Sequence, residues 1–557
     1  MKTAIHGYWG RKSLAAILPV LVLWAATRPA QAQRAPQRRQ ETAAERRARL
    51  ELRASVERFR GRLEAILAGT APSVVALNER RQRAGESAPV RPDKGHWAVV
   101  IADAATGQTL LAQNSQRYFT PASNTKLFTT ALALAKLGPE HRFRTTIETT
   151  GSVDRFGRLL GDLVLVARGD PNLSNRKFPF LEKAERDGPP DKVLAVLADQ
   201  VVARGIHHVE GSLVVNDGYF PPDRYPPGWA IDDMVAGYGA PVSALVVNDN
   251  TLAVEVRPGD QENDAAWFAV EPWADFYEFR NLVRTGAQGT RPRVAIAREP
   301  GSRMVTLEGT VPLGGSPQQA TLAIEEPAEF AAALLKRLLE ARGVRVYGRV
   351  RADHSPWTGE GASVLAEHTS PPLIEAVRLI NKVSQNLHAE VLLRVVGRAE
   401  TGEGTTEAGL RVARALLAEI GIADEDVVLF DGSGLSRRNL VTPEAVVKLL
   451  AWAAKQPWWE AYLATLPVAG VDGTLAERMK AGSPAQRIQG KTGSLGNVNS
   501  LSGFATTLSG KRLVFSIFGN HHNLRGPEAT AVIDALCEAM VEEIGAPPPE
   551  KVKRQRR

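Results

Sequence analysis

Sequence patterns typical of β-strands occur at both ends of the main body of this chain, which is the part between about residues 97 and 544. Two strand patterns, WAVVIADAATG and QTLLAQN, occupy residues 97–114 around a glycine turn, and two more, SLSGFATT and KRLVFSIFGN, occupy residues 500–520. Helical patterns run between them, and a terminal helix is predicted from about Glu528 to Ile544. This order predicts one α/β domain whose sheet is completed by the two ends of the chain.

The length of the chain predicts a further domain or a large insertion in addition to this one domain. At 557 residues it exceeds what a single hydrophobic core usually holds. From about residue 150, short strand patterns such as LVLVARGD and GSLVVNDG recur between Pro, Gly and Asp clusters, with little helical periodicity, until EEPAEFAAALLKRLLEARG restores a helical pattern. We therefore predict a domain formed by residues 91–150 and 326–546, interrupted by a mostly β insertion at residues 151–325.

The N-terminus has the pattern of a secretory signal peptide. Basic residues precede an apolar run from Leu14 to Ala26, and Ala-Gln-Ala follows at residues 30–32. Residues 1–32 are therefore expected to be removed on export to the periplasm or cell envelope. The run is short for a membrane span, which needs roughly 20 residues, so an uncleaved anchor is the alternative. No later stretch predicts a transmembrane segment in the mature chain.

The formal charge of +8 is concentrated at the two ends. Residues 1–32 carry +4, residues 33–64 carry +5 and residues 550–557 carry +4, which leaves −5 on residues 65–549. An acidic main body gives no indication of a nucleic-acid-binding core, so no nucleic-acid partner is expected. Residues 547–557 are assigned as a basic tail.

Residues 33–90 are predicted to form an Arg-rich arm and a helix. Apolar residues recur there at spacings of three and four, which is the stripe of an amphipathic helix; they are Leu52, Val56, Phe59, Leu63 and Ile66. We expect this stripe to pack on the main body. Attachment of the arm to an anionic envelope surface is the alternative.

Cysteine and histidine give no metal site or disulfide. Cys537 is the only cysteine, and it falls in the apolar helical pattern AVIDALCEAMVEEI, where a small buried residue is expected. None of the ten histidines has the spacing of a metal ligand with partners, and His521 and His522 are expected in a solvent-exposed loop.

The stretch PASNTKLFTT at residues 121–130 contains a candidate serine nucleophile with a lysine base. Ser123 and Lys126 are three residues apart, and KLFTTALALAKLG after them predicts a deeply buried helix. On a helix this spacing places both on one face, so a neutral lysine amine can take the hydroxyl proton of the serine. A helix cap is the simpler interpretation of Ser123. The same pattern also occurs at Ser174 and Lys177, where charged, Pro-broken sequence follows.

Two further motifs favour the interpretation of Ser123 as a nucleophile over that of a helix cap. The only Ser-x-Asn is Ser384-Gln385-Asn386, between two helical patterns, and the only Lys-Thr-Gly leads into the closing strands as Lys491-Thr492-Gly493-Ser494. A phosphate-binding loop ending at Lys491 is excluded because residue 485 is Ala, not Gly. The ordered triple is typical of penicillin-binding proteins and serine β-lactamases.

The spacing between the three motifs indicates which branch of these proteins the chain resembles. Ser123 and Ser384 lie 261 residues apart, whereas Ser384 and Lys491 are separated by 107. The chain thus resembles the low-molecular-mass class C penicillin-binding proteins, the D-alanyl-D-alanine carboxypeptidase/endopeptidases of the DacB type, over roughly residues 90–545. Further matches are GDPNLS, YGAPVSALVVNDN, FDGSGLSRRNL and LPVAGVDGTL. The resemblance implies the transpeptidase-like α/β (α+β) fold of serine β-lactamases and penicillin-binding proteins, with a large, mostly β insertion.

The resemblance also implies roles for the motif residues. Ser123 would attack the bond between the last two D-alanines of a peptidoglycan stem peptide, with Lys126 as its base. Ser384 would relay a proton to the leaving amine, and Asn386 would hold the substrate amide. The motif that leads into the closing strands would bind the terminal carboxylate of the substrate, through Lys491, Thr492, Gly493 and Ser494. β-Lactams would act as covalent inhibitors, and no metal or organic cofactor would be needed.

Two alternatives remain at this point. A β-lactamase-like serine hydrolase would turn penicillin over rapidly. A catalytically silent cell-wall-binding protein would act through its insertion and Arg-rich arm, although the three intact motifs argue against it.

Overall fold

The computed structural model describes residues 41–86, 89–174, 176–177, 185–186 and 188–547. The expected signal peptide and residues 548–557 of the basic tail lie outside the described residues. The chain divides into two units, residues 1–49 and residues 50–557. In the first, the described part is the exposed start of helix α1 (Ala43–Leu67), where Arg49 pairs with Glu41. The hydrophobic core belongs to the second unit.

Both ends of the chain build one antiparallel sheet, as the sequence predicts. Its strand order is β2-β1-β25-β24-β23, and β1 pairs with β25 from His96 opposite Asn520 to Asp103 opposite Leu513. The C-terminal strands follow one another as neighbours. The five strands are β1 (His96–Asp103), β2 (Thr109–Gln113), β23 (Ile488–Leu495), β24 (Val498–Thr506) and β25 (Arg512–Asn520).

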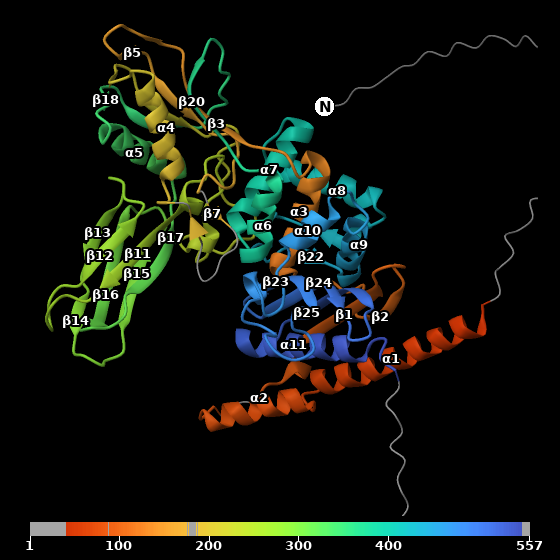
Figure 1. Ribbon diagram of the computed structural model, residues 1–557. Coiled ribbons are helices and arrows are strands. Elements are labelled where there is room, and N and C mark those ends of the chain that lie inside the picture. The colour runs from red at the N-terminus through yellow and green to blue at the C-terminus, as the bar shows by residue number, and fades with distance from the viewer. Residues whose placement is uncertain (1–40, 87–88, 175, 178–184, 187, 548–557) are drawn as a thin grey trace, which may run out of the picture. The chain divides into compact units, whose positions relative to one another are not determined.

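Helices cover both faces of this sheet (Figure 1). Alternate residues of β1 enter different apolar clusters: Val99 packs with α11 (Gly526–Glu543), whereas Val100 packs with the helices of the other face. β1 is therefore buried on both sides, which explains why its sequence is almost uniformly apolar. The helices of the second face are α3 (Thr125–Leu137), α6 (Leu373–Val383), α7 (Asn386–Thr401), α8 (Thr406–Glu419), α9 (Pro443–Ala453) and α10 (Trp459–Thr465).

The predicted N-terminal stripe packs on the main body. Val56, Phe59, Leu63 and Ile66 of α1 are buried in the cluster that contains α11, and Leu52 is half-buried against it. Around this contact, Arg62 donates to Glu542 at 2.6 Å. A second short helix, α2 (Pro72–Arg83), follows α1 and buries Val74 in the same cluster. The expectation of a packed helix is confirmed.

In its described residues, the inserted module contains several small sheets and two α-helices. One sheet has the order β19-β10-β6-β3-β20, another β18-β9-β5-β4, and helices α4 and α5 pack against the first. The elements are β3 (Arg144–Thr149), β4 (Ser152–Val153), β5 (Arg158–Leu160), β6 (Leu163–Val166), α4 (Lys192–Ala203), β9 (His208–Val209), β10 (Leu213–Asn216), α5 (Pro327–Glu340), β18 (Arg345–Val346), β19 (Val350–Asp353) and β20 (Ser363–Thr369).

The rest of the module consists of strands and one short hairpin. Strands β12-β11-β17 form one sheet, and β13-β16-β14, with β15 on β16, form another. These elements are the hairpin β7 (Arg176–Lys177) and β8 (Glu185–Arg186), β11 (Thr251–Arg257), β12 (Trp267–Glu271), β13 (Glu278–Asn281), β14 (Arg284–Gly286), β15 (Arg293–Arg298), β16 (Met304–Pro312) and β17 (Gln318–Ala323).

Strand pairing extends the module beyond the predicted boundaries of 151 and 325. β3, which precedes residue 151, pairs with both β6 and β20, and α5 packs on β10 and β19. By these pairings the module runs from Arg144 to Thr369. The amphipathic pattern of α5 was assigned to the other domain because periodicity shows that a helix has an apolar face but not which sheet it covers. The helix α4 lies in a stretch that the sequence pattern predicts to be mostly β, so this part of the prediction is wrong.

Two smaller expectations have different outcomes. Cys537 is fully buried, as predicted. His522 is also buried, stacked on Trp97, so the prediction of a solvent-exposed position is wrong for this residue.

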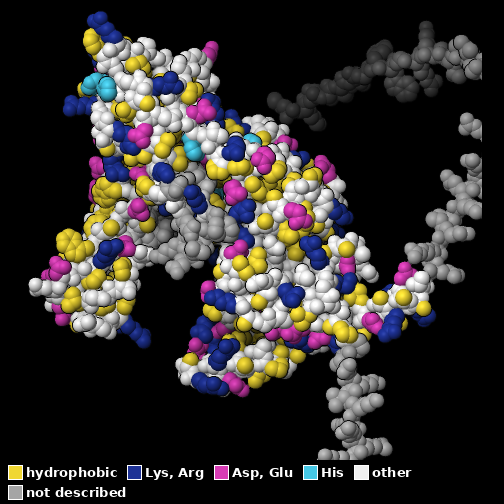
Figure 2. Space-filling view, in the orientation of Figure 1, with side chains coloured by type: hydrophobic (Ala, Val, Ile, Leu, Met, Phe, Trp, Pro, Cys, Tyr) yellow, Lys and Arg dark blue, Asp and Glu magenta, His cyan; other side chains and the backbone are white. Residues whose placement is uncertain are grey.

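Surface charge and hydropathy add two observations. Acidic and basic side chains are intermixed over the visible face rather than separated by sign (Figure 2). Among the described residues, no helix combines the length and the apolar character that crossing a bilayer requires.

Truncating Phe59 tests the packing of α1. Its side chain has 0% exposure. Phe59→Ala should therefore lower the free energy of unfolding by about 3–5 kcal/mol, because it leaves a cavity in the core. The urea midpoint measures this. The exposed neighbour Arg60 is the control, and Arg60→Ala should change stability by less than about 0.5 kcal/mol; equal effects would contradict the packing.

Candidate active site

The first motif lies where a tight turn enters a buried helix. Ser123 is in the 3₁₀ turn Ala122–Asn124, directly before α3, and Lys126 is in the first turn of α3. Ala122 has φ of 48°, a left-handed conformation that is uncommon for residues with a side chain. This turn holds the Ser123 hydroxyl beside the lysine amine, with Oγ and Nζ 2.9 Å apart.

Lys126 is the centre of the site. Its side chain has no exposed surface, and its Nζ lies 2.6 Å from Asn386 Oδ1 and 2.6 Å from the backbone oxygen of Ser433. A neutral amine has two N–H groups and one lone pair. Its N–H groups suit these two oxygens, and its lone pair then faces the Ser123 hydroxyl.

The electrostatics favour that neutral form. Burial lowers the pKa of Lys126 to about 7, although Asp431 and Glu390 oppose the shift. The amine can therefore accept a proton near neutral pH, as a general base for a serine nucleophile must.

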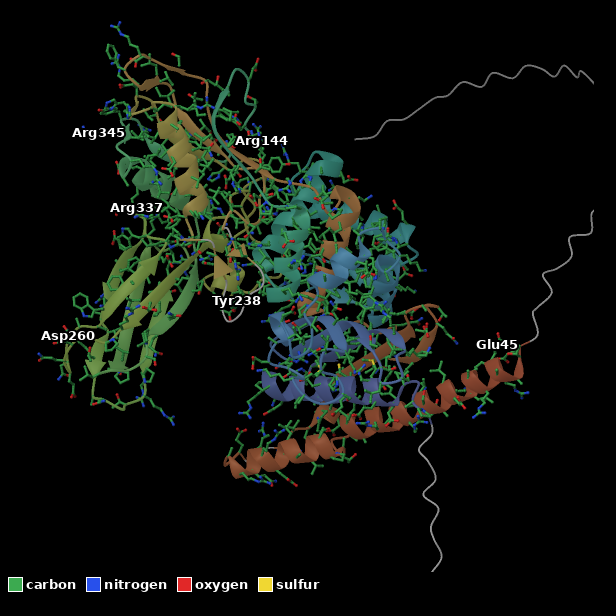
Figure 3. The ribbon with its side chains drawn as sticks, viewed as in Figure 1. Glu45, Arg144, Tyr238, Asp260, Arg337 and Arg345 are labelled. Atoms are coloured by element: carbon green, nitrogen blue, oxygen red, sulfur yellow. The ribbon has the colours of Figure 1, made fainter. Side chains whose placement is uncertain are left out.

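The second motif lies between α6 and α7, as predicted. Ser384 ends α6 in a left-handed conformation (φ 61°), and Asn386 begins α7. The Asn386 amide reaches two partners: Oδ1 accepts from Lys126, and Nδ2 donates to the backbone oxygen of Tyr238 at 2.9 Å. Tyr238 belongs to the inserted module (Figure 3), so the module contributes directly to the site.

The third motif, Lys491 to Ser494, forms half of the edge strand β23. Lys491 is fully buried and donates to Ser384 Oγ at 2.9 Å and to Thr492 O at 2.7 Å. Burial, followed by the nearby Lys126, holds the pKa of Lys491 well below its ordinary value. Thr492 donates to Thr474 Oγ1 at 2.7 Å, and Ser494 Oγ accepts from Asn499 at 3.1 Å. The hydroxyls of Thr492 and Ser494 thus contact supporting residues, not other motif residues.

Gly493 lets β23 approach the turn Ala122–Asn124, which holds the predicted nucleophile Ser123 (the nucleophile turn). A Cβ at this position would lie 2.3 Å from Ser500 Oγ, 2.7 Å from Pro121 O and 3.0 Å from the Ser123 backbone nitrogen. Any side chain would push the strand and the turn apart. The glycine of the motif therefore allows close contact rather than an unusual backbone angle.

Two residues that the sequence analysis did not single out fasten this contact. Asn124 donates to Lys491 O at 3.0 Å and to Ser500 Oγ at 2.8 Å. Ser500 in turn donates to Pro121 O at 2.9 Å. Asn124 is part of the Ser-x-x-Lys motif but is not one of its defining residues, and no signal in the sequence pairs it with Ser500.

Two buried carboxyl groups anchor the loop that positions the backbone oxygen of Ser433. Glu390 on α7 accepts from the backbone N–H groups of Gly432 and Ser433 at 3.0 and 2.7 Å. Asp431 accepts from Gly434 N at 2.9 Å and from Asn439 Nδ2 at 2.6 Å. Burial, together with Asp431, raises the pKa of Glu390 to about 8, which makes it protonated at neutral pH.

The competing Ser-x-x-Lys pair is not a second site. Ser174 is buried and donates to Asp249 at 2.7 Å, whereas Lys177 is exposed. A serine bonded to a carboxylate has no lysine base beside it. Of the two Ser-x-x-Lys patterns, the one at Ser123 places its lysine beside its serine and the one at Ser174 does not, as their sequence contexts predict.

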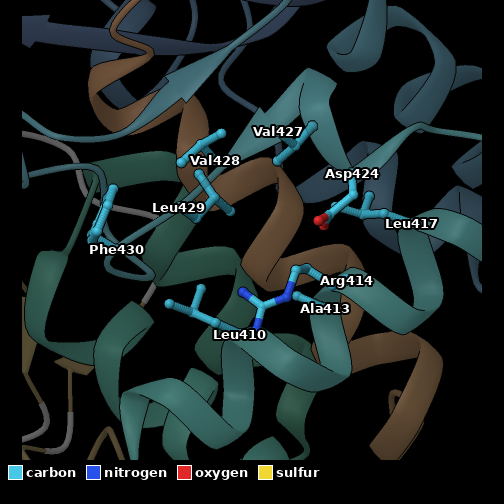
Figure 4. Close-up of a pocket in the computed structure, with 9 residues that line it drawn as sticks. All are labelled: Leu410, Ala413, Arg414, Leu417, Asp424, Val427, Val428, Leu429 and Phe430. Atoms are coloured by element: carbon cyan, nitrogen blue, oxygen red, sulfur yellow. The ribbon is translucent and has the colours of Figure 1, made fainter.

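A separate pocket of about 220 Å³ lies between α8 and residues 424–430. Figure 4 shows its apolar lining together with the side chains of Arg414 and Asp424. None of the motif residues lines it. It is therefore distinct from the place where the motifs converge.

Comparisons with known proteins identify the family. The model of the D-Ala-D-Ala carboxypeptidase 3 (S13) family matches residues 88–540. The chain belongs to this family. It is 36% identical over 475 residues to a D-alanyl-D-alanine carboxypeptidase of Actinomadura sp. (strain R39), covering 82% of this chain and 83% of that protein. It is 26% identical over 441 residues to D-alanyl-D-alanine carboxypeptidase DacB of Haemophilus influenzae, covering 78% and 87%.

A solved structure confirms the fold of this S13 family member. The crystal structure of penicillin-binding protein 4 (dacB) from Haemophilus influenzae superposes with a TM-score of 0.70 at 24% identity, covering 81% of this chain and 96% of that one. The predicted fold class, an α/β penicillin-binding-protein fold, is therefore confirmed.

Substituting Gly493 tests the contact between β23 and the nucleophile turn. Gly493→Ala should lower the free energy of unfolding by about 1–3 kcal/mol, because the added methyl group overlaps Ser500 and Pro121. Gly61 is a matched control on the exposed face of α1, where a Cβ meets nothing within 4 Å. Gly61→Ala should stabilise the protein by about 0.5–1 kcal/mol. Urea unfolding measures both, and a Gly493→Ala protein as stable as the parent would contradict the contact.

Proposed function

We propose that this S13 family member is a serine-type D-alanyl-D-alanine carboxypeptidase that cleaves peptidoglycan stem peptides through an acyl-enzyme on Ser123. The observation that carries the proposal is the buried Lys126 amine, 2.9 Å from the Ser123 hydroxyl and held by two other oxygens. The pattern of residues 1–32 supports action outside the cytoplasm, in the periplasm or cell envelope.

Acylation begins with proton transfer to Lys126. Ser123 Oγ forms a bond to the carbonyl carbon of the penultimate D-alanine while its proton passes to the lone pair of Nζ. Charge then develops on the carbonyl oxygen. We assign the backbone N–H groups of Ser123 and Ser494 to this oxyanion, where one donor is typically worth about 3 kcal/mol of barrier.

Release of the terminal D-alanine requires a proton on its nitrogen. The proton that Lys126 took from Ser123 returns to this nitrogen through the hydroxyl of Ser384, the proposed relay, whose Oγ accepts from Lys491 Nζ at 2.9 Å. The C–N bond breaks as that nitrogen is protonated, which leaves the acyl-enzyme and free D-alanine. Water then attacks the ester and restores Ser123. Asn386 holds the substrate amide, and the strand Lys491 to Ser494 binds the terminal carboxylate.

β-Lactams are proposed to acylate the same serine. The homologue from Haemophilus influenzae has been solved in complex with a β-lactam. The terminal carboxylate of a β-lactam would occupy the strand motif in the same way as the terminal carboxylate of the peptide. A long-lived adduct distinguishes this enzyme from a β-lactamase-like hydrolase, which would release the hydrolysed drug quickly.

Replacing Ser123 tests the nucleophile. Ser123→Ala should not be labelled by a fluorescent penicillin and should release no D-alanine from a peptide ending in D-Ala-D-Ala, because no other hydroxyl among the described residues bonds to the Lys126 amine. Gel fluorescence and a D-alanine assay measure this. Ser174→Ala, the same change in the competing pattern, should still be labelled. Labelling of Ser123→Ala would show that the nucleophile lies elsewhere.

The pH dependence of acylation tests the base. Only neutral Lys126 accepts the proton, so the acylation rate constant should rise with pH around a midpoint near the lysine pKa of about 7. Below the midpoint, it should fall by about tenfold per pH unit. Labelling time courses from pH 5.5 to 8.5 measure the profile, with circular dichroism as a check on folding. A rate constant that does not change over this range is incompatible with a neutral lysine base.

A further inference from the structure

A large groove lies within the inserted module. It has a volume of about 500 Å³, inside the range of about 300–1,000 Å³ that is typical of ligand sites. The segment between β12 and β13 lines it with Trp273, Asp275 and Phe276, and the other lining residues come from α5, β19 and Arg303. Arg337 of α5, which is labelled in Figure 3, is one of them. None of the motif residues lines this cavity, which we call the module groove.

Trp273 presents an aromatic surface in the module groove. The residue is 46% exposed, although tryptophan is mostly buried in folded proteins. Its indole packs beside the ring of Phe279, with the ring centroids 6.0 Å apart, so its position is held. An indole that is held and half-exposed favours a ligand with a flat apolar face, because stacking removes apolar surface from water.

The basic side chains of the groove are already paired. Each of the four basic lining residues forms an ion pair with an acidic side chain, at N–O distances between 2.6 and 3.5 Å. They are Arg303, Lys336, Arg337 and Arg351, and their partners are Glu329, Glu340, Asp191 and Asp353. The groove therefore lacks the excess of positive charge that attracts an anionic polymer.

These ion pairs still offer hydrogen bonds to a neutral ligand. A guanidinium or ammonium group has more N–H groups than one carboxylate uses, and each carboxylate oxygen can accept more than one bond. Because the partners hold one another in place, the donors and acceptors are fixed in position. Asp275 is exposed and forms no ion pair with any residue that the structure describes, so its carboxylate adds a further acceptor.

We propose that the module groove binds the glycan strand of peptidoglycan. This inference rests on the proposed function, which makes peptidoglycan the polymer on which the enzyme acts. The C–H groups on one face of a sugar ring form a flat apolar surface that stacks on Trp273. The edge of the ring carries hydroxyl and amide groups without net charge, and these bind the paired side chains. An apolar protein surface would instead bury these polar groups without new hydrogen bonds, which is costly.

Binding of the strand gives the enzyme a second contact with its substrate. One strand carries many stem peptides, so an enzyme that is held at the module groove meets them at a raised effective concentration. A short soluble peptide has no glycan and gains nothing from the groove. The module therefore favours the intact polymer over released peptides.

Glycan strands from which an amidase has removed the stem peptides test the binding directly. The parent protein should bind immobilised strands, and Trp273→Ala should bind them about tenfold more weakly, because the stacking surface is lost. Surface plasmon resonance gives both dissociation constants. The matched control is Trp267→Ala, since Trp267 is 66% exposed but does not line the groove, and it should bind like the parent. Equal binding by Trp273→Ala and the parent overturns the inference, as does an equal loss in both variants.

Release of D-alanine separates the groove from the active site. On intact peptidoglycan with stems that end in D-Ala-D-Ala, Trp273→Ala should lower the initial rate by about tenfold. On a short soluble peptide with the same ending, its rate should equal that of the parent. An equal fall on both substrates, or no fall on either, contradicts the inference. If the parent releases D-alanine from neither substrate, the proposed function itself fails, and binding to the bare strands still reports on the groove.

Discussion

The burial of one amine organises the active site. Lys126 has no exposed surface, so a charged ammonium there would lose its hydration. Instead, three oxygens surround Nζ, and each comes from a different segment: Ser123 from the nucleophile turn, Asn386 from α7 and Ser433 from a loop. If any one of these segments moves away, the amine loses one of its three hydrogen-bond partners. The lysine therefore ties together the positions of three parts of the chain that are remote in sequence.

The residues around this centre act by holding others in place. Glu390 and Asp431 do not contact Ser123, but their hydrogen bonds shape the loop that presents the Ser433 oxygen. Asn124 and Ser500 fasten the nucleophile turn to β23 and β24. Such networks are effective in a dry interior, where each bond is strong and each missing partner is costly. The same environment that neutralises Lys126 thus also keeps its surroundings rigid.

The sequence predicted the motif residues better than the residues that hold them in place. Fixed spacings and unique motifs mark Ser123, Lys126, Ser384, Asn386 and Lys491 as candidates, and the structure brings them together. Tyr238 went unnoticed because it contributes a backbone oxygen, for which any residue type would serve. The sheet formed by the chain ends was predictable from apolar strand patterns, whereas the extent of the module was not, because pairing of β3 with β20 spans more than 200 residues.

The central position of β1 has a consequence for the order of folding. β1 lies between β2 and β25, so its second neighbour is contributed by residues 512–520, at the far end of the chain. Pairings of such long sequence separation form late, because the closure of the loop between them must come first. During synthesis, the nucleophile turn thus has neither β23 nor β24 against which to pack until residues 488–506 have left the ribosome. A growing chain without these residues contains the predicted nucleophile Ser123 but lacks the strands that complete the site.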